Sequence, residues 1–397
     1  MEMPEEVLIY VSTSTNSASG EDREVRLLVT GGGTGGHIYP ALALAKEFGS
    51  RHPHARIAYV GSQRGLETRV VPQTGLEYAG LPVTGIVGRS VTFKAYGVLG
   101  MVRSLAGALK LLRRFRPDLV LGTGGYVSVP VVLGAQMLGI PTVIQEQNVV
   151  PGTANRLLSR RANAIFVPSE DSIPSFPRSA WARAMVAGNP VRKEFERVDR
   201  DLARRQYGIE PDEYLVVIMS GSGGAATMNR AAAEWFSHPG SGDSRLRVLY
   251  ATGKRYYRSV VGEIGDPPPG VRIVEYIDDA SGVLAAADLL VCRAGAMTLA
   301  EATFLGLPMI VVPSPNVAHK HQGANARALA KAGAAIVIED GDLSGDRLES
   351  EVTYLVSDAD KLRSMSEASR GLADPGALDR MVDTIEELMG IREVDDS

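Results

Sequence analysis

The chemically most informative residues near the amino terminus are a run of glycines that leads directly into a histidine. Residues 26–40 read RLLVTGGGTGGHIYP, so five glycines and one threonine occupy positions 31–36 before His37. Glycine has no Cβ atom, and its backbone can approach a ligand closely and adopt positive φ angles. A helix from about Pro40 would add free N–H groups and a partial positive charge, which suit a phosphate. The stretch therefore indicates a phosphate-type ligand, and a tight strand–helix turn is the alternative.

Two known phosphate-binding motifs do not fit this stretch. A P-loop has Lys followed by Ser or Thr after its last glycine, whereas this chain has His37 and Ile38. A dinucleotide-binding fold places an acid about 20 positions further on to hold a ribose. The corresponding segment, AYVGSQRG, has no acid before Glu67. The sequence therefore disfavours a P-loop nucleotide site and a nicotinamide-dependent oxidoreductase.

Glycine-bearing turns recur after three further apolar runs. Gly124 and Gly125 follow the run 118–122, Ser222 lies among glycines after the run 214–219, and RAGAMTLAE follows the run 288–292. Ligands of open α/β sheets bind beyond the carboxyl ends of the strands. Four such turns, two in each half of the chain, predict two phosphorylated ligands that face each other across a cleft.

These turns require a scaffold, and short apolar runs alternate with helix-length segments along the whole chain. Such runs are typical of strands in a parallel sheet that helices cover on both faces. The alternation occurs twice, which predicts an α/β fold with two doubly wound, Rossmann-like domains. We expect the domains to join within AGNPVRKEF, because Gly-Asn-Pro interrupts regular structure. The predicted parts are a disordered extension (1–24), an amino-terminal domain (25–187), a carboxyl-terminal domain (188–374) and an amphipathic last helix (375–390).

Composition argues against several classes of protein. The chain has 397 residues, a formal net charge of -4 and one cysteine, Cys292, which we expect to be a buried core residue. The charge argues against a nucleic-acid partner, and a single thiol, which forms no internal disulfide, indicates a reducing compartment. We expect no secretory signal and no membrane-spanning helix, because no apolar stretch reaches about 18 residues.

Together these motifs resemble the MurG family of peripheral membrane glycosyltransferases. The matching segments are GGTGGHIYPALALA, GTGGYVSVP, EQNVVPGTANR, GNPVR, YIDDASGVLAAADLLVCRAGAMTLAE and HQGANARAL. The family transfers N-acetylglucosamine from UDP to the C4 hydroxyl of undecaprenyl-diphosphate-linked N-acetylmuramyl-pentapeptide, a step of peptidoglycan synthesis at the cytoplasmic face of the cell membrane. The resemblance implies the GT-B architecture, in which two Rossmann-like domains face a cleft and the last helix returns to the amino-terminal domain.

The resemblance assigns UDP-N-acetylglucosamine to the carboxyl-terminal domain. Ser222 would contact the donor phosphate beside Arg192, and the backbone of Ile277 would read the uracil edge. Glu301 would accept hydrogen bonds from the ribose hydroxyls, and Gln322 would hold the sugar hydroxyls. The other donor-associated positions are Ala296, Met297, Thr298, Leu299, Ala300, Thr34, Gly35, Gly36 and Asn148. One departure concerns this site, because Gly223 stands where the family has glutamine, which affects expected donor affinity but not the fold.

The amino-terminal domain would hold the lipid-linked acceptor. The resemblance assigns its diphosphate to Gly33, Gly124, Gly125 and Tyr126. Transfer with inversion requires a base for the acceptor hydroxyl, and His37 is the candidate because an ordinary imidazole titrates near neutral pH. The alternatives are that His37 donates a hydrogen bond to phosphate or starts a helix, and His321 is a weaker candidate. Helix N-termini could stabilise the leaving diphosphate, so the sequence requires no metal ion or other cofactor.

A basic, partly apolar segment could bring the enzyme to its lipid substrate. Residues 78–117 contain no Asp or Glu, and their basic and apolar side chains include Arg89, Phe93, Lys94, Leu99 and Arg103. Such a segment is suited to an anionic membrane surface, and an ordinary basic helix is the alternative. Other functions stay open: a UDP-N-acetylglucosamine 2-epimerase, a transferase with another glycolipid acceptor, or an inactive relative that binds the nucleotide sugar.

Overall fold

The structure, a computed structural model, describes residues 9–10, 24–83, 91–221, 223–237, 244–316 and 321–392. For residues 9–10 and 91–99 the backbone alone is described. The chain divides into two compact units, Met1–Pro190 with Gly376–Ser397, and Val191–Pro375. It therefore passes from one unit to the other after Pro190, close to the boundary expected at 187/188, and returns after Pro375.

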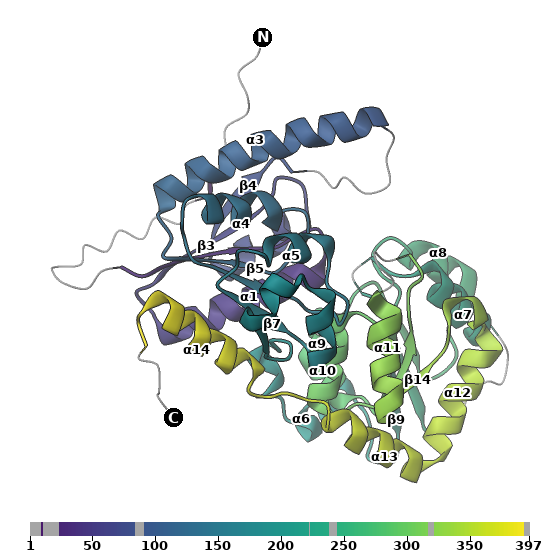
Figure 1. Cartoon of the computed structure of the whole chain (residues 1–397). Coiled ribbons are helices and arrows are strands. Elements are labelled where there is room, and N and C mark those ends of the chain that lie inside the picture. Colours follow the sequence, from purple (N-terminus) through teal and green to yellow (C-terminus); the bar gives the residue numbers. More distant parts are fainter. Residues whose placement is uncertain are drawn as a thin grey trace. The chain divides into compact units, whose positions relative to one another are not determined.

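One doubly wound sheet forms the centre of the first unit (Figure 1). Its strand order is β1-β4-β3-β2-β5-β6-β7-β8, and each described pair is parallel except β1 with β4. The strands are β1 (Ile9–Tyr10), β2 (Arg26–Thr30), β3 (Arg56–Ser62), β4 (Glu77–Leu81), β5 (Leu119–Gly122), β6 (Thr142–Gln145), β7 (Ala164–Val167) and β8 (Ala184–Val186). The order reverses between β2 and β5, and the turns that follow these two strands lie at this switch point.

Helices cover both faces of this sheet because its strands are apolar on both faces. Leu27, Val29 and Leu121 pack on the side of α1 (Gly35–Arg51) and α14 (Ala377–Met389). Leu28 and Val120 pack on the other side, with α3 (Val91–Phe115), α4 (Ser128–Met137) and α5 (Thr153–Leu158). A short helix, α2 (Glu67–Val70), follows β3. The central strands therefore need apolar residues at successive positions, which is the pattern that predicted them.

Helix α14 belongs to the first unit although it ends the described chain. Its Met381 and Ile385 are fully buried against the core that contains α1. Arg51, at the end of α1, forms ion pairs with Asp379 and Asp383 of α14 at 2.5 Å each. Four apolar side chains of α14, Leu378, Met381, Val382 and Ile385, are buried in the core shared with α1. Because burial of a large apolar side chain contributes about 1.5–3 kcal/mol, packing contributes more to this interface than the partly exposed ion pairs.

The second unit repeats the doubly wound pattern with a parallel sheet of order β11-β10-β9-β12-β13-β14. Its strands are β9 (Tyr214–Met219), β10 (Leu246–Ala251), β11 (Val271–Val274), β12 (Leu289–Arg293), β13 (Met309–Val312) and β14 (Ala335–Val337). One face packs on α6 (Arg200–Tyr207), α9 (Ala280–Ala286), α10 (Ala296–Leu305) and α11 (His321–Ala332). The other face packs on α7 (Ala226–Phe236), α8 (Tyr257–Ile264), α12 (Gly345–Ser357) and α13 (Ala359–Arg370). Cys292 is buried in this core, as predicted, and burial raises its thiol pKa to about 12.

Several elements begin or occur where the sequence did not predict them. Helix α1 begins at Gly35 rather than near Pro40, because Thr34 is extended (φ -146°, ψ 157°) and its carbonyl already accepts from the His37 and Ile38 N–H groups. Strands β4 and β8 were not predicted. Ile9–Tyr10 form a strand within the extension expected to lack order, and the rest of residues 1–23 lies outside the described residues.

Candidate active site

Two glycine turns meet at the switch point of the first unit. Gly33 (φ 86°) lies in the turn after β2, and Gly124 (φ 102°) and Gly125 (φ 80°) lie in the turn after β5. A side chain at Gly125 would collide with the carbonyl oxygen of Gly32, so the two turns are in direct backbone contact. The ring of Tyr126 lies against Gly33. The structure thus brings together Gly33, Gly124, Gly125 and Tyr126, the four residues predicted to hold the acceptor diphosphate.

His37 lies in the first turn of α1, where its ring faces the second glycine turn. Its Nδ1 lies 3.1 Å from the Thr123 carbonyl oxygen and 3.1 Å from Gln147 Oε1. A carbonyl oxygen can only accept, so Nδ1 carries the proton in the neutral ring and Nε2 keeps its lone pair. A Cβ atom on Gly124 would lie 3.0 Å from His37 Nδ1, so a glycine leaves room for the ring. The arrangement provides an imidazole that can accept a proton at Nε2.

Gln147, which was not predicted as a site residue, contacts the His37 ring at Nδ1. Its side chain is almost fully buried, and its Nε2 donates to the Thr123 carbonyl at 2.8 Å and to the Gln145 carbonyl at 3.3 Å. Those acceptors fix the orientation of the amide, so Oε1 faces His37 as an acceptor. The only sequence feature that pointed to Gln147 was its place in EQNVVPGTANR, a segment that matches the family, and the resemblance gave it no role.

Asn148 is positioned by a buried carboxylate. Glu146 is almost fully buried, and its Oε1 accepts from the Asn148 backbone N–H at 2.9 Å and from the Asn148 amide at 3.0 Å. Its Oε2 accepts from Gly152 N–H at 3.0 Å and from the Asn155 amide at 2.9 Å. Asn155 Oδ1 is buried without a hydrogen-bond partner among the described residues. Glu146 therefore fixes the loop 147–152 and places Asn155 next to Gly124.

Thr34, Gly35 and Gly36 form the start of α1. Thr34 is the N-cap residue, but its side chain makes no capping hydrogen bond. The first backbone N–H groups of a helix have no partner within the helix, so this end of α1 can bind an anion through its backbone. The structure places these three residues beside the first glycine turn of the first unit and places Asn148 on the loop that follows β6.

In the second unit, the turns after β9 and β12 lead into helices α7 and α10. Neither helix has a side-chain cap at its N-terminus, where Ala225 and Gly295 are the N-cap residues. Their first N–H groups can therefore bind phosphate oxygens. Ser222 lies outside the described residues, and Gly223 is exposed with open space where a Cβ atom would lie.

Arg192 and Glu301, which were predicted as separate donor contacts, form an ion pair. Arg192 Nη2 lies 3.0 Å and Nε 3.3 Å from Glu301 Oε1. Burial raises the pKa of Glu301, and the Arg192 guanidinium opposes this effect. Oε2 has no hydrogen-bond partner in the part of the chain that the structure describes. The pair can thus present one carboxylate oxygen, held in place by Arg192, to a pair of ribose hydroxyls.

The remaining predicted donor residues differ in accessibility. Met297 and Leu299 are buried in α10, so only their backbones could contact a ligand, whereas Ala296, Thr298 and Ala300 are partly exposed on the same helix. Ile277 is buried after β11. Gln322, at the start of α11, accepts from Ser314 N–H at 2.8 Å through Oε1, which leaves its amide N–H groups for a ligand. The described residues contain no cluster of three or more side chains suited to a metal ion.

Comparison with known proteins decides the family. Residues 27–167 match the glycosyltransferase family 28 N-terminal domain, and residues 215–383 match the family 28 C-terminal domain. The chain belongs to glycosyltransferase family 28. A relative from Desulforudis audaxviator (strain MP104C) is 44% identical over 377 residues, which cover 92% of this chain and 99% of the relative. It is named UDP-N-acetylglucosamine--N-acetylmuramyl-(pentapeptide) pyrophosphoryl-undecaprenol N-acetylglucosamine transferase.

Solved structures with the same fold superpose on this chain. A crystal structure of Acinetobacter baumannii MurG superposes with a TM-score of 0.69 at 26% identity, covering 91% of this chain and 99% of that one. UDP-GlcNAc 2-epimerase from Neisseria meningitidis, bound to UDP-GlcNAc, superposes at 0.61 with 14% identity, covering 92% and 100%, which reflects the fold alone. The GT-B fold class predicted from the sequence is confirmed, and so is the predicted resemblance to the MurG family.

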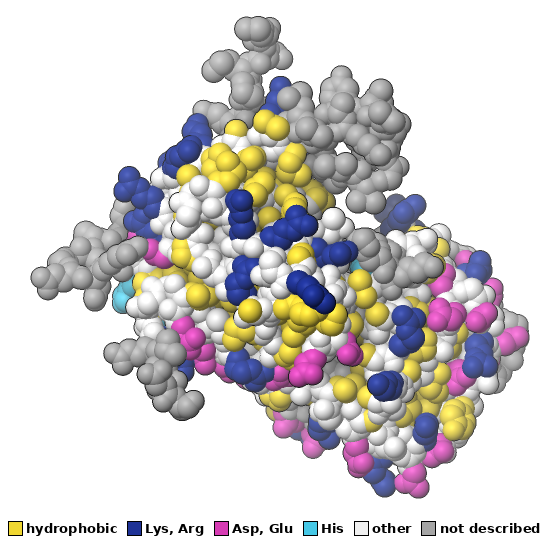
Figure 2. All heavy atoms as spheres, viewed as in Figure 1, with side chains coloured by type: hydrophobic (Ala, Val, Ile, Leu, Met, Phe, Trp, Pro, Cys, Tyr) yellow, Lys and Arg dark blue, Asp and Glu magenta, His cyan; other side chains and the backbone are white. Residues whose placement is uncertain are grey.

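The family 28 chain also carries a surface that is basic and apolar but contains no acid. Helices α3, α4 and α5 have no Asp or Glu, and they cover the same face of the first sheet. We define the basic–apolar surface by the exposed side chains of these helices and of Arg160, which follows α5: Val102, Arg103, Lys110, Arg113, Arg114, Met137, Arg156, Leu157 and Arg160. Figure 2 shows dark blue side chains gathered around yellow ones over this part of the molecule.

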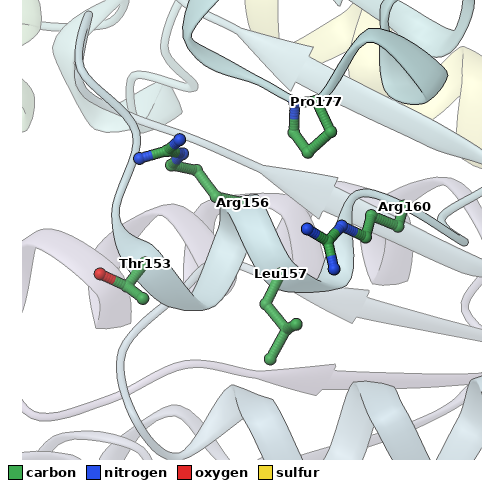
Figure 3. Close-up of a pocket in the computed structure, with 5 residues that line it drawn as sticks. All are labelled: Thr153, Arg156, Leu157, Arg160 and Pro177. Carbon is green, nitrogen blue, oxygen red and sulfur yellow. The ribbon is translucent and has the colours of Figure 1, made fainter.

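A shallow pocket of about 220 Å³ lies on this surface at α5 (Figure 3). Arg156 and Arg160 extend from one side of the helix, with Leu157 and Pro177 beside them. Leu105, Leu109 and Leu112 of α3 face Gly134 of α4. Of the residues predicted to meet the membrane, Arg103 is exposed, while Arg89 and the side chains of Phe93, Lys94 and Leu99 lie outside the described residues. No helix among the described residues has both the length and the apolar composition needed to cross a bilayer.

Proposed function

We propose that this chain transfers N-acetylglucosamine from UDP-N-acetylglucosamine to the C4 hydroxyl of undecaprenyl-diphosphate-linked N-acetylmuramyl-pentapeptide, with inversion at the anomeric carbon. The observation that carries the proposal is the 44% identity, over 99% of its length, to a relative named for this transfer. The geometry around His37 supports it, because a base with a free ring nitrogen lies beside the turns predicted to hold the acceptor diphosphate.

In the proposed step, the acceptor hydroxyl oxygen attacks the anomeric carbon of the donor. The bond from that carbon to the UDP oxygen breaks, the electron pair leaves with UDP, and the hydroxyl proton passes to His37 Nε2. The resulting imidazolium is stabilised because Nδ1–H keeps its contacts with the Thr123 carbonyl and Gln147 Oε1. His321 remains the weaker candidate for the base.

Donor binding is proposed for the second unit. The uncapped N-termini of α7 and α10 would stabilise the diphosphate as it leaves. Glu301 would accept from the ribose, and Gln322 would donate to the sugar. The two helix N-termini provide positive potential without a metal ion, so we propose that transfer needs no cofactor. Gly223 leaves open space where a longer side chain could reach the donor.

We further propose that the enzyme is peripheral to the cytoplasmic face of the cell membrane and docks there through the basic–apolar surface. Each basic residue near an anionic surface contributes about 1 kcal/mol, and the exposed Val102, Met137 and Leu157 can enter the interface. The test is sedimentation with vesicles that contain anionic lipid, with and without added salt. Arg113→Glu should weaken binding, whereas the matched change Arg363→Glu on α13 of the second unit should not. Vesicle binding that changes neither with added salt nor with Arg113→Glu would refute docking through this surface.

The experiment that tests the transfer uses UDP-N-acetylglucosamine labelled in the sugar and a short-chain, water-soluble analogue of the lipid-linked acceptor. The expected result is a labelled disaccharide product in the presence of a metal chelator. Release of the C2 epimer from UDP-N-acetylglucosamine alone would instead identify an epimerase. Binding of UDP without any product, with this and other glycolipid acceptors, would identify an inactive relative.

A further inference from the structure

A carboxylate is buried directly beneath the glycine turn of the first unit. Glu67, the first residue of α2, is 0% exposed. Its Oε1 accepts from the backbone N–H of Ser62 at 3.1 Å and from the Ser62 hydroxyl at 2.6 Å. Its Oε2 accepts from the backbone N–H of Gly33 at 3.4 Å. Glu67 therefore links the end of β3 to the turn that we assign to the acceptor.

The cost of this arrangement indicates that the carboxylate has a task beyond filling the core. No Lys, Arg or His side chain forms an ion pair with Glu67 within the described part of the chain, and burial of a charge without a partner is costly. Side chains are absent from three positions around it: a Cβ atom on Gly32 would lie 2.6 Å from Oε1, one on Gly61 would lie 2.7 Å from Cγ, and one on Gly65 would collide with Oε2. The sequence thus keeps space for a buried acid that is held by hydrogen bonds and by no cation among the described residues.

A buried tyrosine holds the same turn two residues earlier, at Gly31. The Tyr59 hydroxyl donates to the Gly31 carbonyl at 2.8 Å, and the Tyr59 ring is fully buried. Burial raises its pKa well above 10.0, with the charge of Glu67 adding to the effect, so the hydroxyl stays a donor. A second buried tyrosine, Tyr78, has its ring 6.2 Å away and donates instead to the Ser62 carbonyl, outside the turn.

We propose that Glu67 and Tyr59 are positioning residues for the acceptor. They fix the conformation of the glycine turn, because Glu67 accepts a hydrogen bond from the Gly33 N–H and Tyr59 donates one to the Gly31 carbonyl. This inference rests on the proposed function and deepens it. The Gly33 N–H points inward to Glu67, so it is not the group that meets the acceptor anion. The anion is met instead by the uncapped first N–H groups of α1 at Gly35 and Gly36.

The two tyrosines provide a matched pair of variants for the test. Tyr59→Phe and Tyr78→Phe each remove one buried hydroxyl, and only the first removes a contact to the turn. The measurements are kcat, the KM for the short-chain acceptor analogue, the KM for UDP-N-acetylglucosamine and the thermal unfolding midpoint. We expect both variants to lose similar stability. We expect Tyr59→Phe alone to raise the acceptor KM, by about tenfold, which is the scale for a buried carbonyl left without its donor.

Glu67→Gln gives an independent test, because it changes the hydrogen bond to the Gly33 N–H and leaves Tyr59 in place. Three donors converge on the Glu67 carboxylate, and a carboxamide must turn its own N–H groups toward one of them. We expect an acceptor KM raised about tenfold or more, with the donor KM changed by no more than about twofold. Ser62→Ala is the control, since it removes one of these hydrogen bonds without touching the turn.

The outcomes separate the inference from the proposed function. If the unchanged enzyme transfers no sugar to the analogue, the proposed function fails and the inference fails with it. If transfer occurs but Tyr59→Phe and Tyr78→Phe have the same acceptor KM, the hydrogen bond from Tyr59 to Gly31 does not position the turn for the acceptor. The inference alone is then refuted. If Glu67→Gln is too unstable to assay, the tyrosine pair still decides, because loss of one hydroxyl leaves both rings in place.

Discussion

Removal of the His37 imidazole should slow transfer without affecting the donor. His37→Ala takes away the base and leaves the second unit, where we place UDP-N-acetylglucosamine, unchanged. General-base loss lowers rates by about 10²–10⁴-fold, which corresponds to about 2.7–5.4 kcal/mol on the activation barrier at 1.36 kcal/mol per factor of ten. The assay is steady-state transfer to the short-chain acceptor analogue, with UDP binding measured separately by calorimetry.

Gln147→Ala should give a smaller and predictable loss. In the structure, His37 Nδ1 faces two acceptors, and the variant keeps one of them, the Thr123 carbonyl. Loss of one hydrogen bond costs about 0.5–1.5 kcal/mol, so kcat should fall by about two- to twelvefold. We therefore expect His37→Ala to lower kcat more than Gln147→Ala does. A His37→Ala enzyme as active as the parent, or a Gln147→Ala enzyme more impaired than His37→Ala, would refute the role of His37 as base.

Three further predictions follow from other parts of the structure. Arg192→Met should raise the pKa of Glu301 further, because burial already raises it and Arg192 opposes that effect; UDP affinity should then fall more steeply from pH 8 to pH 6 than in the parent. Ile385→Ala, at a fully buried position of α14, should destabilise the first unit by about 2–5 kcal/mol in urea unfolding, without weakening UDP binding. Asp279→Ala should cost about 1 kcal/mol, because its carboxylate caps α9 through Gly282 N–H at 2.9 Å.

Each of these has an outcome that would contradict it. Identical pH dependence in Arg192→Met and the parent would mean that the ionisation of Glu301 does not control donor binding. Loss of UDP binding in Ile385→Ala would tie α14 to the second unit. The pKa of Asp279 is lowered because hydrogen bonds outweigh the effect of burial, so its stabilisation is present above pH 3.8 and is lost as the pH falls through the folded-state pKa. A constant stability difference between Asp279→Ala and the parent across that range would refute this origin.

The sequence was sufficient for the fold because parallel strands buried on both faces are visible as apolar runs. Strands β2 and β9 were predicted for this reason. Strand β4 escaped prediction because its residues, EYAGL, include a charged residue and a glycine. Strand β8 is short and largely exposed. Helix α1 starts earlier than expected because Thr34, rather than Pro40, takes the extended conformation of an N-cap.

The site was predicted less completely, since side-chain partners distant in sequence decide its chemistry. The glycine turns and His37 were visible as a motif, but the proton on Nδ1 is fixed by Thr123 and Gln147, about a hundred positions away. Glu67 was noted only as the first acid after AYVGSQRG, too late in the sequence for a ribose ligand, and its burial beneath Gly33 follows from the packing of β3 on β2. Nothing in the sequence indicated that His52 hydrogen-bonds Glu386 of α14, at 2.9 Å.

The return of the chain to the first unit at Gly376 affects how the protein can be dissected. Residues 191–375 form one continuous stretch and can be expressed as a single piece for donor-binding studies. A piece that ends at Pro190 would expose the surface of α1 that Met381 and Ile385 normally cover. An acceptor-binding fragment therefore needs residues 376–392 joined by a designed linker or supplied as a separate peptide.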